Sequence, residues 1–178
     1  MWSNLFTGEP VTLAAMLYRR EQRSQLQYHW LSNNPQLSLL SMTMNIPGAV
    51  KTSPRLKQFF DEAIEAIKKM LGEEHFVQQE QLALATGDEY YALLNVSPSD
   101  LKTWLVNFEQ QWHAGRLLDL DVLYFSEGVV QQTSRTQLGL PLRQCYVCEQ
   151  SAKVCARQKA HSQEELQQAI SRLLHKKE

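Results

Sequence analysis

Residues 115–122 read GRLLDLDV, a stretch that places Asp119 and Asp121 one residue apart within an apolar run. The alternation of aliphatic residues with the two acids predicts a β-strand. Residues i and i+2 leave the same face of a strand, about 6.5–7 Å apart along the chain. We therefore expect the aliphatic side chains to anchor one face in the core while both carboxylates share the other face.

Two neighbouring carboxylates repel each other unless a cation lies between them. Their hard oxygen atoms suit Mg²⁺, which proteins often hold with one or two carboxylates and complete with substrate phosphates. That arrangement serves metal-assisted phosphoryl or nucleotidyl transfer. Gly115 would let the backbone approach a ligand closely, and Arg116 would add a guanidinium group that fits phosphate. The alternative is the solvated face of an edge strand, and the local pattern leaves both interpretations open.

The composition is that of an ordinary globular protein, with 43% hydrophobic and 21% charged residues. A length of 178 residues predicts a single domain over residues 1–178 with a sizeable core. The formal net charge of −1 argues against a bulk electrostatic binder of nucleic acid or of membranes. From Arg135 onward, however, eight basic residues face four acids, so an anion site would come from local clustering.

The sequence offers no signal for export or membrane insertion. No apolar run approaches the ~20 residues needed to span a bilayer, and residues 1–5 lack the basic region and apolar core of a secretory signal. The three cysteines are an odd number and lie within eleven residues, from Cys145 to Cys155. This is not a secreted disulfide framework, so we expect a reducing, cytoplasmic location.

The periodicity predicts an α+β fold with a mainly antiparallel sheet. Strands are expected over 37–46, 75–85, 89–96 and 129–134 and in the acidic stretch. Helices are expected over 10–31, from Ser53-Pro54, from Ser97-Pro98, in a short segment through the cysteines and after Ser162. The resulting β-α-β-β-α-β core order, followed by a C-terminal helical segment, matches the split βαβ arrangement of ferredoxin-like folds.

The cysteines and one histidine form a second candidate site. The spacing Cys145-x2-Cys148-x6-Cys155-x5-His161 could supply three thiolates and one imidazole to a structural zinc ion. If the chain from Cys148 to Cys155 is helical, its seven residues rise about 10.5 Å, which is too far for both sulfurs to reach one ion at ~2.3 Å. No glycine or proline interrupts that segment. We therefore expect buried structural thiols, with structural zinc as the alternative.

Two motifs resemble those of a known family. Residues 115–122 resemble the G-R-L-x-D-[IL]-D-V signature of the citrate lyase holo-acyl-carrier-protein synthases, the apo-citrate lyase phosphoribosyl-dephospho-CoA transferases. Residues 143–157 read RQCYVCEQSAKVCAR and, with His161, resemble that family's R-x-C-x2-C-E-Q-S-A-x2-C-A-R run and the histidine after it. Residues 19–23 (RREQR) and 47–51 (PGAVK) fit the same pattern more loosely. Together these matches span most of the chain.

The resemblance implies a nucleotidyltransferase that transfers 2′-(5″-triphosphoribosyl)-3′-dephospho-CoA to a serine of the acyl carrier protein subunit of citrate lyase and releases pyrophosphate. Asp119 and Asp121 would be the catalytic pair and the Mg²⁺ ligands. The phosphate-binding candidates are the basic residues Arg116, Lys51, Arg143 and Arg157.

The remaining roles and two other functions stay open. His161 is a candidate general base, and a third carboxylate could come from Asp88, Glu89 or Glu127. A protein of another class, a non-catalytic adaptor stabilised by zinc, would use the cysteine cluster for structure alone. A related transferase could load a similar prosthetic group onto another carrier, such as that of malonate decarboxylase.

Overall fold

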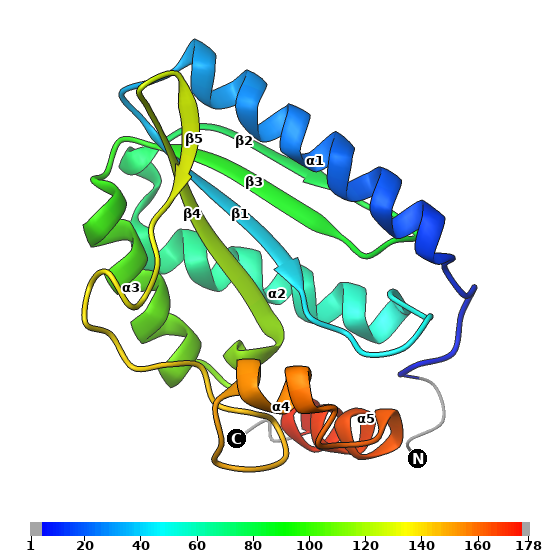
Figure 1. Cartoon of the computed structure of the whole chain (residues 1–178). Coiled ribbons are helices and arrows are strands. Elements are labelled where there is room, and N and C mark those ends of the chain that lie inside the picture. Colours follow the sequence, from blue (N-terminus) through cyan, green and yellow to red (C-terminus); the bar gives the residue numbers. More distant parts are fainter. Residues whose placement is uncertain (1–4, 176–178) are drawn as a thin grey trace.

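The computed structural model describes residues 5–175, and within these residues five strands form one antiparallel sheet (Figure 1). The strands are β1 (Ser38–Met44), β2 (Phe76–Leu82), β3 (Glu89–Leu94), β4 (Leu118–Ser126) and β5 (Val129–Gln132). Their order across the sheet is β2-β3-β1-β4-β5. Since β3 lies antiparallel between β1 and β2, the split βαβ arrangement expected from the sequence is confirmed.

Helices cover both faces of the sheet and one of its ends (Figure 1). They are α1 (Leu13–Asn33), α2 (Pro54–Leu71), α3 (Pro98–Gln111), α4 (Ala152–Gln158) and α5 (Gln163–His175). The predicted caps are confirmed: the side chain of Ser53 accepts from the backbone N–H of Leu56 at 3.3 Å, and that of Ser97 from Asp100 at 3.2 Å. A proline then occupies the first turn of α2 and of α3, where no N–H partner is needed.

The alternation along β4 divides its side chains between two hydrophobic clusters. The larger cluster joins α2, α3 and α5 to one face of the sheet and contains Leu118, Leu120 and Val122 of β4. The smaller cluster, on the opposite face, packs Trp30 and Leu31 of α1 against residues of β1, β3 and β4. Asp119 and Asp121 therefore leave β4 on the face that α1 covers.

Helix α1 covers that face with apolar contacts at one end only. Its C-terminal residues supply the smaller cluster. Its preceding turns make polar contacts instead: Gln27 donates to Ser41 Oγ at 2.9 Å, and both Arg19 and Arg23 bind Glu89. The sheet surface beside β4 is thus lined by polar side chains, which suits a binding site better than a packing interface.

The helix predicted to run through the cysteines is wrong for its first half. Residues 145–151 form an irregular loop that is closed by a β-bridge between Gln144 and Ser151. The backbone N–H of Cys145 donates to the Gln150 carbonyl at 2.8 Å, so the chain turns back on itself before α4 begins. Only Cys155 among the cysteines lies in a helix.

Two of the expectations drawn from the sequence concern residues that the structure does not describe. Residues 1–4, used in the search for a secretory signal, and Lys176 and Lys177 of the basic C-terminal group lie outside the described residues. Within residues 5–175, no helix combines the length and the apolar character required to cross a bilayer.

Candidate active site and cysteine cluster

The two acids of the motif lie side by side on the sheet. Asp119 is paired in register with Thr43 of β1, and Asp121 with Ser41. The Asp119 side chain keeps 46% of its surface exposed, and Asp121 is half-buried. The pair is therefore fixed by the strand backbone and open to solvent on one side, as a site for an ion and a polar substrate requires.

The environment of Asp121 favours a neutral group or a nearby cation. Burial raises the pKa of this carboxyl, and the negative charge of Asp119 raises it further. Lys102 and Arg143 oppose these effects, as does Gln132, whose Nε2 donates to Asp121 Oδ1 at 2.6 Å. Because the net shift is upward, a bound cation would relieve an electrostatic cost that the protein's own residues leave uncompensated.

Two basic side chains occupy the edge of β4 where β5 stops. The β5 pairing covers only Leu123 onward, which leaves the carbonyls of Leu118 and Leu120 without strand partners in β5. Lys102 Nζ donates to the Leu120 carbonyl at 2.7 Å, and Arg143 Nη2 donates to that of Leu118 at 3.1 Å. Side chains thus complete the edge hydrogen bonds and bring positive charge to the two acids.

Arg143 is positioned by a buried ion-pair network. Its Nε and Nη2 both lie 3.1 Å from the carboxylate of Glu109, and Arg135 binds the same carboxylate. A third contact, from Nη1 to Asp119 Oδ1, is also 3.1 Å long. Burial disfavours the charged guanidinium, but Glu109 and Asp119 outweigh that effect and raise the pKa of Arg143. The group is a permanent, oriented cation beside the acid pair.

Sequence reasoning missed Lys102 and Glu109. They lie seven residues apart on α3, and their side chains flank the apolar stripe of that helix at two turns' separation. The sequence signal for these two residues is a lysine and a glutamate at this spacing beside the stripe that faces the core. That signal does not identify the partners of Glu109, which lie 26 and 34 positions further along the chain.

Arg116 is engaged with the cysteine-bearing loop. Its Nη2 donates to the carbonyls of Gln144 and Cys145, and its guanidinium carbon lies 5.7 Å from the centroid of the Tyr146 ring. Gly115 approaches protein rather than ligand: a Cβ at this position would lie 2.6 Å from the carbonyl oxygen of Glu109. This part of the motif joins α3, β4 and the loop.

Lys51 lines a cavity of about 170 Å³ together with Arg23, Thr43 and Asp88. Its Nζ donates to the Ile46 carbonyl at 2.6 Å, and burial lowers its pKa. Because Thr43 is the cross-strand partner of Asp119, this cavity adjoins the acid pair on the same side of the sheet. Two basic side chains therefore line the cavity next to the acid pair, and one of them, Arg23, is also paired with Glu89 at 2.6 Å.

Of the three candidate third carboxylates, Glu89 lies on the face of the acid pair. It precedes Tyr91 by two residues on β3, and Tyr91 and Asp121 flank Ser41 in register. Burial favours the neutral form of Glu89, but hydrogen bonds from Arg19, Tyr91 and Arg23 outweigh it and lower its pKa. Glu89 is therefore an ionised anchor for two arginines.

The other two candidate carboxylates have different settings. Asp88 is buried, accepts from the backbone N–H of Leu84 at 3.4 Å and has its pKa raised mainly by burial. Glu127 lies in the turn between β4 and β5 with a positive φ of 52°. Neither has a contact with Asp119 or Asp121 among those described.

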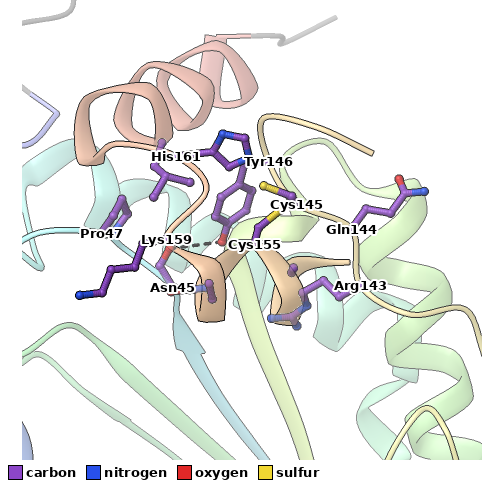
Figure 2. Close-up of a pocket in the computed structure, with 12 residues that line it drawn as sticks. Asn45, Pro47, Arg143, Gln144, Cys145, Tyr146, Cys155, Lys159 and His161 are labelled. Atoms are coloured by element: carbon purple, nitrogen blue, oxygen red, sulfur yellow. Dashed lines mark hydrogen bonds between the residues drawn. The ribbon is translucent and has the colours of Figure 1, made fainter. Parts of the chain in front are cut away.

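The cysteine cluster converges, contrary to expectation, and Figure 2 draws Cys145, Cys155 and His161 of this group. The Sγ atom of Cys148 lies 3.5 Å from that of Cys155 and 3.3 Å from His161 Nε2. One ligand atom from each of these residues and from Cys145 lies within 4.8 Å of the others. The sequence argument that Cys148 and Cys155 are too far apart is wrong, because Cys148 lies in the loop and not in the helix. These residues could hold a metal ion.

A cavity of about 350 Å³ is lined by Cys145, Cys155 and His161 of the cluster and also by Asn45, Arg143 and Tyr146. Figure 2 shows the Tyr146 ring in this cavity, with its hydroxyl donating to the Asn45 carbonyl at 3.3 Å. His161 faces the sulfurs, which does not favour its role as a general base at the acid pair. Arg157 is exposed on α4, and no described contact joins it to the acids.

Comparison with known proteins gives a consistent result over nearly the whole chain. A family model described as apo-citrate lyase phosphoribosyl-dephospho-CoA transferase matches residues 11–177. A Streptococcus pyogenes serotype M18 (strain MGAS8232) protein, named probable apo-citrate lyase phosphoribosyl-dephospho-CoA transferase, is 48% identical over 170 residues, covering 96% of this chain and 88% of that protein. An Escherichia coli (strain SE11) protein, named apo-citrate lyase phosphoribosyl-dephospho-CoA transferase, is 35% identical over 173 residues, covering 96% and 92%.

Proposed function

The chain belongs to the apo-citrate lyase phosphoribosyl-dephospho-CoA transferase family, and on this basis we propose that it makes the holo-acyl carrier protein of citrate lyase. The substrate is 2′-(5″-triphosphoribosyl)-3′-dephospho-CoA, and the acceptor is a serine of the apo-acyl carrier protein. The class of reaction is nucleotidyl transfer. The three unpaired cysteines suit a reducing cytoplasm as the compartment.

In this reaction the serine oxygen forms a bond to the α-phosphorus, and the bond from that phosphorus to the β-phosphate oxygen breaks. The serine proton is lost, and pyrophosphate carries away the electron pair of the broken bond. Negative charge therefore builds on the phosphates as the bond breaks, and fixed positive charge beside them lowers the barrier.

Asp119 and Asp121 are the residues that would hold Mg²⁺. They offer hard oxygen atoms on one face of one strand, and burial and the charge of Asp119 raise the pKa of Asp121, so a bound cation would favour its ionised form. When bound, the ion would neutralise charge on the triphosphate and align it for displacement. The two carboxylates would supply this function without rearrangement, because β-sheet pairing already holds them.

The basic residues divide into two groups around the acids. Arg143 lies at the β4 edge, held by Glu109 and in contact with Asp119, so it is placed to bind the leaving pyrophosphate. Lys51 and Arg23 line the cavity on the other side of Thr43 and would bind the remaining phosphates of the substrate. Arg116 would bind phosphate only if it released the carbonyls of Gln144 and Cys145. Arg157, which is exposed on α4, would contact the substrate only at the outer edge of the site.

The single structural observation that supports the catalytic part of this proposal is the open pair of carboxylates on one sheet face beside Arg143. The test mixes the purified protein with Mg²⁺, the triphosphoribosyl substrate and the apo-carrier, and follows the intact mass of the carrier. Asp119→Asn and Asp121→Asn should each lower the rate about 10²-fold or more, equivalent to about 3 kcal/mol of transition-state stabilisation.

Asp61→Asn is the matched control, because Asp61 is 48% exposed on α2 and pairs with Lys57 on the surface. It should leave the rate unchanged. An unaltered rate in both motif variants, each shown to be folded by circular dichroism, would remove the two acids from the mechanism. The same assay with the apo-carrier of malonate decarboxylase tests the alternative acceptor. If that carrier were modified faster than the citrate lyase carrier, it would be the substrate instead.

A further inference from the structure

Residues 134–162 connect β5 to α5 and carry Arg143 to the acid pair, yet they have almost no core of their own. Throughout this segment, which is described in full, only Cys145 and Cys155 are fully buried, and Tyr146 packs, partly buried, against the larger cluster. These few side chains do not bury enough apolar surface to offset the conformational entropy of ordering a segment of this length. Small structural units with so little hydrophobic core are commonly stabilised by a metal ion or by disulfides.

We propose that Cys145, Cys148, Cys155 and His161 bind one structural zinc ion that fixes this segment at the end of the sheet. In a tetrahedral site with Zn–S bonds of ~2.3 Å and a Zn–N bond of ~2.0–2.1 Å, neighbouring ligand atoms lie about 3.5–3.8 Å apart. The measured separations from Cys148 Sγ, 3.5 Å to Cys155 Sγ and 3.3 Å to His161 Nε2, are close to that geometry.

The ligand set selects the metal and its role. Thiolates are soft ligands that favour zinc over the hard cations Mg²⁺ and Ca²⁺. Four protein ligands fill a tetrahedron and leave no position for substrate, which is the arrangement of structural zinc sites. The backbone N–H of Val147 lies 3.5 Å from Cys145 Sγ and donates to it, so the loop already supports a negatively charged sulfur at this position.

A disulfide explains these positions less well. A bond between Cys148 and Cys155 would require ~2.05 Å between their sulfurs, and the measured distance is 3.5 Å. It would also leave Cys145 as a buried thiol and give the neighbouring His161 ring no part. The ligands come from the loop, from α4 and from the link before α5 (Figure 2), so one ion would join all of them.

The zinc would position Arg143 by fixing the loop backbone next to it. Arg116, in the 3₁₀ turn just before β4, donates to the carbonyls of Gln144 and Cys145. The Arg143 carbonyl accepts from the backbone N–H of Ala152 at 2.9 Å. The residue that contacts Asp119 is therefore two positions from a proposed zinc ligand and is hydrogen-bonded to the first residue of α4.

The first experiment measures zinc by elemental mass spectrometry in the full chain, purified in reducing buffer with zinc supplied. We expect one zinc per chain. Cys148→Ser and His161→Asn should each weaken binding roughly 100-fold or more, since removing a ligand costs at least as much as removing the groups around it. His29→Asn is the matched control, because His29 is exposed on α1, and it should retain the ion.

A second measurement does not depend on whether the variants fold. Cobalt(II) added to the unmodified, metal-free chain should give thiolate-to-metal charge-transfer absorption and the intense visible bands of a tetrahedral site, and zinc should abolish both. Asp119→Asn should behave like the unmodified chain, because its carboxylate belongs to the other site. No zinc uptake with all three thiols equally reactive, or full uptake by Cys148→Ser, would overturn the proposal.

Discussion

The acid pair and the cysteine cluster are held in place by different interactions. Asp119 and Asp121 belong to a strand that pairs with β1 along six residue pairs, and the alternate side chains of that strand lie in the core. The cluster residues come from a loop, a short helix and a link, and one β-bridge, Gln144 to Ser151, closes the loop. The first site is fixed by the backbone before any ion binds, whereas on our proposal the second is fixed by its ion.

This difference suits the two functions that we propose. A site that must bind and release a metal-bound polyphosphate benefits from ligands that stay in place without the ion. A structural site has no such need, because its ion remains bound and supplies folding free energy directly. Arg143 belongs to both regions, since it lies in the loop segment and contacts Asp119 through one nitrogen. Perturbing its partners tests how far the two regions are independent.

The largest expected effect is at Glu109, which joins the regions through Arg135 and Arg143. Glu109→Gln should lower the free energy of unfolding by about 3–5 kcal/mol, because it leaves Arg135 without a carboxylate and Arg143 with only its contact to Asp119, and both guanidinium groups are largely buried. Chemical denaturation followed by circular dichroism measures this change. The control is Glu65→Gln, whose carboxylate is 73% exposed and pairs with Lys68, and which should cost no more than about 1 kcal/mol.

Equal effects at Glu109 and Glu65 would mean that the buried network adds nothing beyond a surface ion pair. The acid pair would then be independent of the loop, and the two regions would be more separate than their shared residue Arg143 implies. Activity measured on the same variant separates stability from positioning, since loss of orientation at Arg143 should lower the rate even where the protein remains folded.

Removal of zinc should raise the mobility of the backbone in residues 143–161 and leave that of the sheet unchanged. Chelation of the zinc-loaded chain should raise backbone hydrogen exchange in residues 143–161 about tenfold or more, because the proposed ion is the main crosslink there. Exchange in β1 and β4 should not change, since these strands are held by the sheet and by the larger hydrophobic cluster. Equal acceleration in all of these segments would show that the two regions unfold together.

The features of the fold that arise locally were predictable from the sequence. The alternation in residues 118–122 was enough to place both acids on one strand face, since side-chain direction in a strand has a period of two. The serine-proline pairs predicted the starts of α2 and α3, because capping depends on neighbouring residues alone. The order of elements then indicated the antiparallel sheet.

Features that depend on distant residues were not predictable. The partnership of Glu109 with Arg143 joins residues 34 positions apart, and nothing in the local pattern of either residue identifies the other. The loop that brings Cys148 to Cys155 contains no glycine or proline, so the sequence favoured a helix and the ligands appeared too far apart. The β-bridge from Gln144 to Ser151 turns the chain back on itself and so fixes the path of the loop, and this pairing is visible only in the structure.

A smaller effect should show that the acid pair is kept at a cost to stability. In metal-free buffer at neutral pH, Asp121→Asn should raise the free energy of unfolding by about 1 kcal/mol, although it should lower the rate of transfer about 10²-fold or more. Because the pKa of Asp121 is raised in the folded protein, the native state binds this proton more tightly than the unfolded chain does. Above that pKa the ionised carboxylate therefore lowers the free energy of unfolding. As the pH falls through the pKa, the group becomes protonated and this destabilisation disappears.

Asparagine imitates the protonated form of Asp121 and can still accept from Gln132. Asp61→Asn, at an exposed position on α2, serves again as the control and should not stabilise the chain. A destabilised Asp121→Asn variant would contradict the electrostatic description, because it would mean that the ionised group is favourable in the fold. Thermal unfolding at two pH values, one neutral and one near 4, distinguishes the cases, since the difference between variant and unmodified protein should shrink at the lower pH.

The smallest expected effect is a shift in the pH dependence of transfer. Since Asp121 must be ionised to bind Mg²⁺, the acidic limb of the kcat/KM profile should lie above the ordinary aspartate range at low Mg²⁺. Saturating Mg²⁺ competes with the proton and should move that limb to lower pH by roughly one unit or less, which corresponds to about 1.4 kcal/mol at most. Changing zinc at constant Mg²⁺ should leave the limb in place, because the cysteine cluster presents sulfur and imidazole to its ion and no carboxylate. A limb that moved with zinc and not with Mg²⁺ would reverse the roles assigned to the two regions.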